Sequence, residues 1–190
     1  MPVISELDVG RAAEHLVVAD LILSGYQAYL TEQGLPYDIV LDHGAKLYRA
    51  QVKATQKPMK VRSRGFRGDG VYWFNVRRGR KEIGRRRGYS AEFDILALVA
   101  LDIRVIAYVP IFGRIPQTVR LQSPGYTESP AAVRRGWGQS RRAKSISQFP
   151  IEGAMAALTG ARPVLPPPSS RVIQFRRPEQ ETLFSIETTA

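Results

Sequence analysis

The stretch from Pro36 to Lys57, PYDIVLDHGAKLYRAQVKATQK, decides the fold that the sequence predicts. Apolar and polar residues alternate along it on both sides of Asp42, His43 and Gly44. This pattern is typical of two short antiparallel strands joined by a tight turn. Because strand side chains point alternately to the two faces of a sheet, one set is expected to face a core: Ile39, Leu41, Tyr48, Ala50, Val52 and Ala54.

The other face of the second strand carries polar side chains, which are Arg49, Gln51, Lys53 and Thr55. The hairpin would bring Asp38 across toward Gln51 and Lys53. A carboxylate beside a second oxygen donor can hold a hard divalent cation such as Mg²⁺ (or Mn²⁺). A neighbouring lysine can orient a water molecule and offset charge that develops on a phosphate. The pattern therefore suits hydrolysis of a phosphodiester, although an exposed ion pair on a surface hairpin would produce it too.

Other elements follow from capping and periodicity. Ser5 and Asp8 predict a capping box, and the helix that follows would run to about Ser24 and end at Gly25. Glu14 on this helix would supply a third oxygen ligand if the helix packs against the hairpin. Further strands are expected at Tyr26–Thr31, Val71–Val76, Asp94–Leu101 and Arg104–Pro110, with a loop around Gly65–Gly70 and a helix at Ser147–Leu158.

A chain of 190 residues suits one domain with its own core. The segment RPVLPPPSSR, from Arg162, reads as an extended linker. We therefore expect a domain over residues 1–160 and a flexible proline-rich linker and tail over 161–190. The absence of cysteine, secretory signal and uninterrupted apolar span predicts a cytoplasmic protein without a membrane segment.

Positive charge is concentrated directly after the hairpin. Residues 1–55 carry 4 Lys or Arg against 7 Asp or Glu, whereas residues 56–88 carry 12 against 2. Such a block indicates a polyanion partner, most commonly nucleic acid. The residues expected to bind it are Lys57, Lys60, Arg62, Arg64, Arg67, Arg77, Arg78, Arg80, Lys81, Arg85, Arg86 and Arg87. The aromatic residues among them, such as Trp73, are expected in the core rather than stacked on bases.

Pro36-Tyr37-Asp38, followed by Gln51-Val52-Lys53 and preceded by Glu14 in a helix, resembles the PD-(D/E)XK nuclease superfamily. Within it, the chain is most similar to archaeal-type Holliday junction resolvases and to intron-encoded homing endonucleases, in which a glutamine can occupy the acidic position. Tyr89 and the hairpin from Asp94 look like the later part of that branch. The resemblance covers roughly residues 5–110 and implies an α/β, restriction-endonuclease-like fold: a mixed β-sheet flanked by helices.

The resemblance implies Mg²⁺-dependent DNA cleavage that leaves a 5′-phosphate, in repair or recombination at the nucleoid. Asp38 would bridge the metal, Gln51 would coordinate through its side-chain oxygen, and Glu14 would be an accessory ligand. Lys53 would position the nucleophile, and the Val52 carbonyl could contribute. Because the neutral Gln51 removes a negative charge, a non-catalytic nucleic-acid-binding protein on the same fold is the alternative. An RNA-binding protein is a second one.

The tail contains QETLF, which resembles the short peptide by which bacterial replication and repair enzymes dock on the sliding clamp. Gln180, Leu183 and Phe184 would be the anchors. A hydrophobic stretch that packs on its own domain or on a second subunit is the favoured alternative. Cutting two strands symmetrically needs two active sites, so a homodimer or higher homo-oligomer is expected. Neither the preferred DNA structure nor the subunit number follows from the sequence.

Overall fold

The structure, a computed structural model, describes residues 5–63, 66–77, 92–124 and 144–160. Helix α1 spans Glu6–Leu23 and begins with the predicted capping box. The Ser5 side chain accepts a hydrogen bond from the Asp8 N–H at 3.2 Å, and Asp8 Oδ2 accepts one from the Ser5 N–H at 3.2 Å. The helix ends before Gly25, whose φ of 89° is in the left-handed region that glycine tolerates. Both predicted ends of this helix are confirmed.

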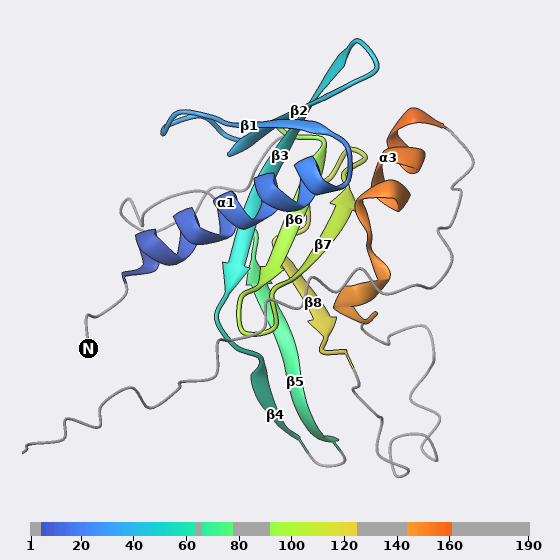
Figure 1. Cartoon of the computed structure of the whole chain (residues 1–190). Coiled ribbons are helices and arrows are strands. Elements are labelled where there is room, and N and C mark those ends of the chain that lie inside the picture. Colours follow the sequence, from blue (N-terminus) through green and yellow to red (C-terminus); the bar gives the residue numbers. More distant parts are fainter. Residues whose placement is uncertain (1–4, 64–65, 78–91, 125–143, 161–190) are drawn as a thin grey trace, which may run out of the picture.

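The main sheet has the strand order β1-β2-β3-β6-β7 (Figure 1). Its strands are β1 (Gln27–Leu30), β2 (Ile39–His43), β3 (Lys46–Thr55), β6 (Ile95–Ala100) and β7 (Val105–Pro110). The pair β3–β6 is parallel and the other pairs are antiparallel, so the predicted mixed sheet is confirmed.

The β2–β3 turn lies two residues later than the sequence pattern indicated. Asp42 and His43 still pair with β3, and Gly44 and Ala45 form the turn, with φ of 61° and 66°. Two successive positive φ values are typical of the two-residue turn whose twist matches that of the flanking strands. His43 also contacts Tyr26 edge to face, at 5.3 Å between ring centroids.

A second sheet, with the order β4-β5-β8, was not foreseen. It consists of β4 (Met59–Ser63), β5 (Phe66–Asn75) and β8 (Thr118–Gln122). The prediction of a loop around Gly65–Gly70 is therefore wrong for the described residues of that stretch, which extend the predicted strand Val71–Val76 toward its beginning. Gly70 is needed for packing rather than for a loop: it has φ 102°, and a Cβ there would lie 2.5 Å from Pro58 Cβ.

The central part of the main sheet is buried on both faces. Helix α1 and helix α3 (Ile151–Thr159) cover one face, where residues such as Val17 and Met155 join Ile39, Val52 and Val99 in one core cluster. The second sheet covers the other face, with Tyr72 and Phe74 against Leu96 and Leu98. All six residues of β6 are consequently buried, as expected for a central strand between two layers.

The last predicted helix is interrupted. A 3₁₀ turn, η2, covers Ile146–Gln148, and α3 begins only at Ile151 because Pro150 at the N-cap cannot continue a preceding helix. Gly160, with φ 71°, ends α3 as predicted. The predicted tail, 161–190, lies outside the described residues. No helix in the described ranges is long and apolar enough to cross a bilayer.

Candidate active site

The site lies at the start of β2, where the neighbouring strand β3 continues beyond its pairing with β2. The last paired residues are Ile39 and Ala50, whereas β3 runs on to Thr55. Asp38, just before β2, adds one more backbone bond, from its N–H to the Ala50 carbonyl at 2.9 Å. Backbone groups two residues apart on a strand point to the same side. The N–H and C=O of Val52 therefore point, like those of Ala50, to the edge of β3 on which β2 lies, but beyond the start of β2.

The Asp38 carboxylate occupies that edge. Its Oδ2 accepts a hydrogen bond from the Val52 N–H at 2.7 Å and a second one from the Gln51 side-chain amide. The same amide nitrogen donates to the Val52 carbonyl at 3.2 Å. The predicted meeting of Asp38 and Gln51 is therefore a direct contact, and the Val52 carbonyl lies beside it.

The sequence predicted Gln51 on the polar face of β3, and the structure shows that this residue is buried there. It is 4% exposed and is the one buried polar or charged residue in the part of the chain that the structure describes. Its parallel neighbours on β6 explain the burial: Gln51 pairs with Leu96 and Lys53 with Leu98, both of which lie under the second sheet. The opposite face behaves as predicted, with Tyr48, Ala50 and Val52 buried.

Electrostatic interactions bring Glu14 and Lys53 into the same neighbourhood. Burial raises the pKa of the Asp38 carboxyl, while the Val52 N–H, the Lys53 charge and the Gln51 amide oppose the rise. Burial also raises the pKa of Glu14, and the negative charge of Asp38 raises it further, whereas the charges of His15, Arg11 and Lys53 lower it. The structure thus gathers all four predicted residues, two in contact and two within electrostatic range.

The oxygen atoms at this edge fit a hard divalent cation. Asp38 supplies a carboxylate, the Val52 carbonyl supplies a neutral oxygen, and Gln51 supplies another if its amide turns. The Glu14 carboxylate is close enough to interact electrostatically with Asp38. Across the described ranges, no three His, Cys, Asp or Glu side chains lie close enough together to hold a metal ion. A cation at this edge would therefore depend on the amide and on a backbone carbonyl as well as on carboxylates.

Arg49 is a neighbour of the site to which the sequence reasoning gave no role. Its N–H donates to Asp94 Oδ2 at 2.8 Å, its Nε forms an ion pair with the same oxygen at 3.5 Å, and its guanidinium lies 5.9 Å from the Tyr37 ring centre. The sequence could have indicated that Arg49 lies near the site, because it is two residues before Gln51 and therefore on the same face of the strand.

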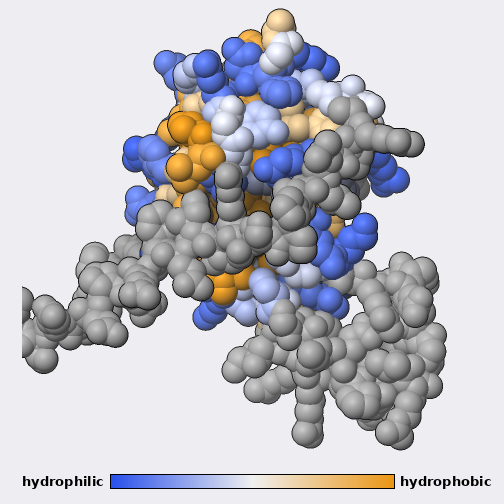
Figure 2. Space-filling view, turned by 45° about the vertical axis from the view of Figure 1, so that its right-hand side comes forward, coloured by the Kyte–Doolittle hydropathy of each residue, from blue (hydrophilic) through white to orange (hydrophobic). Residues whose placement is uncertain are grey.

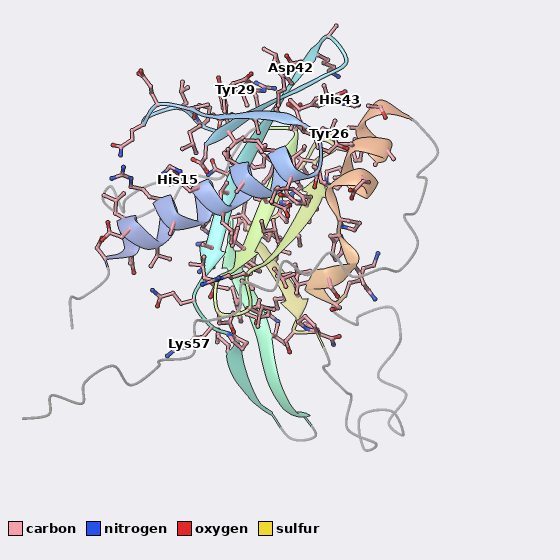
Figure 3. The ribbon with its side chains drawn as sticks, in the orientation of Figure 1. His15, Tyr26, Tyr29, Asp42, His43 and Lys57 are labelled. Carbon is pink, nitrogen blue, oxygen red and sulfur yellow. The ribbon has the colours of Figure 1, made fainter. Side chains whose placement is uncertain are left out.

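The predicted nucleic-acid-binding residues start at the junction of β3 and β4. Lys57 is exposed there, at the far end of the main sheet from His43 (Figure 3). Arg77 is exposed just after β5, and its Nη2 donates to Gln117 Oε1 at 3.0 Å. Lys60 and Arg62 lie on β4 and Arg67 lies on β5. The others lie outside the described residues: Arg64, Arg78, Arg80, Lys81, Arg85, Arg86 and Arg87.

Trp73 is not in the core, contrary to the sequence expectation. Tyr72 and Phe74 on either side of it are buried, but Trp73 is 36% exposed on the outer face of the second sheet. The Arg120 guanidinium lies 3.9 Å from its ring centre, from the paired position on β8. Alternation along β5 explains this, since only one face of the second sheet packs on the main sheet.

Among the residues that Figure 2 colours, hydrophilic ones are widespread and apolar ones lie in separate patches. The anchors predicted in the tail, Gln180, Leu183 and Phe184, lie outside the described residues, as does Tyr89. No structural observation therefore bears on a partner that binds the tail.

The sequence model of a family described as PD-(D/E)XK endonuclease matches residues 4–128, which include Glu14, Asp38, Gln51 and Lys53. Among solved structures, the chain is similar to that of a bacterial homing endonuclease, I-Ssp6803I, with 19% sequence identity and a TM-score of 0.57. That match covers 82% of this chain and 95% of the other. The likeness shows a restriction-endonuclease-like fold, as predicted. No curated protein sequence gives a significant match.

Proposed function

The chain belongs to the PD-(D/E)XK endonuclease family, and from this premise we propose that it is a divalent-metal-dependent DNA endonuclease that leaves a 5′-phosphate. One observation carries the proposal. Beside the start of β2, the Asp38 carboxylate, the Gln51 amide and the Val52 carbonyl meet. Lys53 and Glu14 interact electrostatically with Asp38.

Each residue has a role that its position supports. Asp38, Gln51, Glu14 and the Val52 carbonyl would hold the cation, Mg²⁺ or Mn²⁺. When bound, such an ion polarises the phosphate and lowers the pKa of a water molecule. Lys53, two residues after Gln51 on the same strand face, orients the attacking water and offsets charge that builds on the phosphate oxygens.

DNA binding is assigned to the basic segment after the catalytic strand. β3 leads into the antiparallel β4–β5 ribbon within four residues, and Lys57, Lys60, Arg62 and Arg67 lie at or on this ribbon. An antiparallel two-stranded ribbon fits the major groove of DNA. Contacts from these residues to phosphates would make binding strongly dependent on salt concentration. DNA repair or recombination is the proposed context, in the cytoplasm at the nucleoid.

The oligomeric state of the protein and the role of its C-terminal segment are two further proposals. Two symmetric cuts require two sites, which supports a homodimer or larger homo-oligomer. The QETLF segment, with Gln180, Leu183 and Phe184, is proposed as a sliding-clamp peptide on sequence grounds alone. The residues after 160 would then form a tail outside the nuclease domain.

The neutral side chain of Gln51 favours one alternative, a DNA-binding protein that does not cut. A neutral amide gives the site one negative charge fewer than a carboxylate would, which weakens its attraction for a cation. This alternative predicts salt-sensitive DNA binding without metal-dependent turnover.

The decisive experiment measures cleavage of linear duplex, branched and single-stranded DNA in Mg²⁺, in Mn²⁺ and in EDTA. Asp38→Asn should abolish cleavage while the circular dichroism spectrum stays native. Asp42→Asn, the same change on the same hairpin but away from the site, should leave cleavage unchanged. Wild-type protein that binds DNA but cuts none of these substrates would establish the non-catalytic alternative.

A further inference from the structure

The two protons of the Gln51 amide nitrogen are both used within the site. One is directed to Asp38 Oδ2 and the other to the Val52 carbonyl at 3.2 Å. The side chain is 4% exposed, so water does not compete for these protons. The amide nitrogen therefore satisfies the two protein oxygens that converge at the open edge of β3.

The chemistry of the partners decides which way the amide points. Both partners of the nitrogen are acceptors: a carboxylate and a carbonyl carry lone pairs but no proton. An amide oxygen turned toward them would meet two further oxygens with nothing between them. Burial makes such an unpaired contact costly. The nitrogen-inward orientation thus requires no cation, whereas the oxygen-inward orientation requires one.

The two orientations exclude each other. A cation held by Asp38, Val52 and Gln51 uses the same lone pairs that now accept the amide protons, and it needs the amide oxygen rather than the nitrogen. A glutamate at this position would have no such choice, because its carboxylate would face Asp38 with no proton to donate. The residue at position 51 therefore decides whether the Asp38 and Val52 oxygens are paired by amide protons or need a bound cation.

We propose that the Gln51 amide nitrogen is an internal substitute for the cation, and that a divalent ion enters only when the amide turns. The inference rests on the proposed function for its meaning, since it assigns the cation to the nuclease site. It implies that the free protein takes up the ion weakly. The phosphate of bound DNA supplies the additional negative charge, so ion uptake and DNA binding are coupled.

Thermal unfolding tests the role of the amide without measuring activity. Gln51→Glu places two carboxylates together, so its Tm in EDTA should fall by about 4–8 °C relative to wild type. Millimolar Mg²⁺ should restore much of that loss, because a ligand that binds the folded state stabilises it. Wild type should gain little from Mg²⁺. Gln148→Glu, the same change at an exposed residue on η2, should alter neither value.

Coupling to DNA has its own measurement. Mn²⁺ bound to wild-type protein, counted by the loss of free-ion signal in electron paramagnetic resonance, should rise at least tenfold when duplex DNA is added. Gln51→Glu should bind Mn²⁺ without DNA. Equal Mn²⁺ binding by wild type and Gln51→Glu in the absence of DNA would overturn the proposal, as would equal Tm responses of Gln51→Glu and Gln148→Glu.

The outcome is separable from that of the proposed function. A wild-type protein that cuts no DNA refutes the nuclease proposal, yet the Tm and Mn²⁺ comparisons still decide the role of Gln51. Conversely, a wild-type protein that cuts DNA while Gln51→Glu unfolds in the same way with and without Mg²⁺ keeps the nuclease and eliminates the internal substitute.

Discussion

The β2–β3 hairpin and the β4–β5 ribbon follow each other in sequence and have similar pairing, but their surroundings differ. The half of the hairpin away from its turn is buried, with Ile39, Ala50 and Val52 in the core, and there Asp38 contacts Gln51 beside the start of β2. The ribbon continues from β3 and, with Lys57 before it, contains five Lys or Arg between residues 57 and 67 and no Asp or Glu. Burial of Gln51 holds its amide against Asp38, whereas a segment rich in Lys and Arg suits contact with a polyanion.

The largest expected effect separates catalysis from binding on the hairpin. Lys53→Ala should lower the rate of DNA cleavage about 10²–10³-fold, because the lysine stabilises charge that appears only in the transition state. The affinity for DNA in EDTA should change little. Lys46→Ala, at the solvent-exposed end of the same strand, is the control and should cut at the wild-type rate. Parallel losses of affinity and cleavage in Lys53→Ala would assign it to binding instead.

Gly70 tests whether the ribbon is held by packing. Gly70→Ala should lower the free energy of unfolding by about 2–3 kcal/mol, because the added Cβ would overlap Pro58 at a left-handed φ. Urea denaturation measures it. Gly10→Ala is a control of opposite sign: no atom lies within 4 Å of the added Cβ, so the variant should gain about 0.5–1 kcal/mol from helix propensity. Equal effects would mean that the Pro58 contact does not constrain β5.

The exposed basic residues just before β4 and just after β5 are expected to contribute to the salt dependence of binding. The double variant Lys57→Ala, Arg77→Ala should bind duplex DNA roughly tenfold more weakly and reduce the slope of log K against log salt by about 1–2. Fluorescence anisotropy across a salt series measures both. Lys46→Ala changes a charge on the hairpin and should leave the slope as it is. A slope unaltered in the double variant would move the DNA surface away from these two residues.

The smallest effect concerns a carboxylate of α1 on the side away from the ribbon. Asp20 accepts a hydrogen bond from the Tyr108 hydroxyl at 2.6 Å. Burial raises the pKa of the Asp20 carboxyl, the hydrogen bond from Tyr108 lowers it, and the negative charge of Glu152 raises it, so that the net change is upward. A raised carboxyl pKa costs folding free energy as pH rises through it.

The stability that wild type loses as pH rises from 4 to 7 should therefore be smaller in Asp20→Asn. The free energy of unfolding measured at both pH values checks this, and the exposed Asp8 provides the comparison through Asp8→Asn. The pKa of Asp8 is lowered by its hydrogen bonds to Ser5, so the stability that this variant loses should be seen at pH 7 and should shrink only as pH falls through the lowered pKa. The same pH profile for wild type and Asp20→Asn would contradict the assignment.

Local chemistry made some features predictable. The Ser5–Asp8 capping box and Gly25 set the ends of α1, and strand alternation identified Ile39, Leu41 and Val52 as core residues. The convergence of Asp38 on Gln51 also followed from the hairpin. Alternation could not show that the polar face of β3 is covered, since nothing in the residues around Gly65–Gly70 indicated a second sheet. The unforeseen second sheet also explains why Trp73 was wrongly predicted in the core, since it lies on the outer face of that sheet.

The sequence by itself determined the elements whose signals are short-range, together with the order of the family motif, because capping, alternation and residue spacing need only neighbouring residues. Only the tertiary structure decided that Gln51 is buried and that its amide nitrogen faces both Asp38 and the Val52 carbonyl. Those properties depend on β2 beginning only at Ile39 while β3 continues past Ala50, and on strands β5 and β8 packing over a face that the sequence presents as polar. The physical reason is that burial and hydrogen-bond partners are set by residues far apart in the chain.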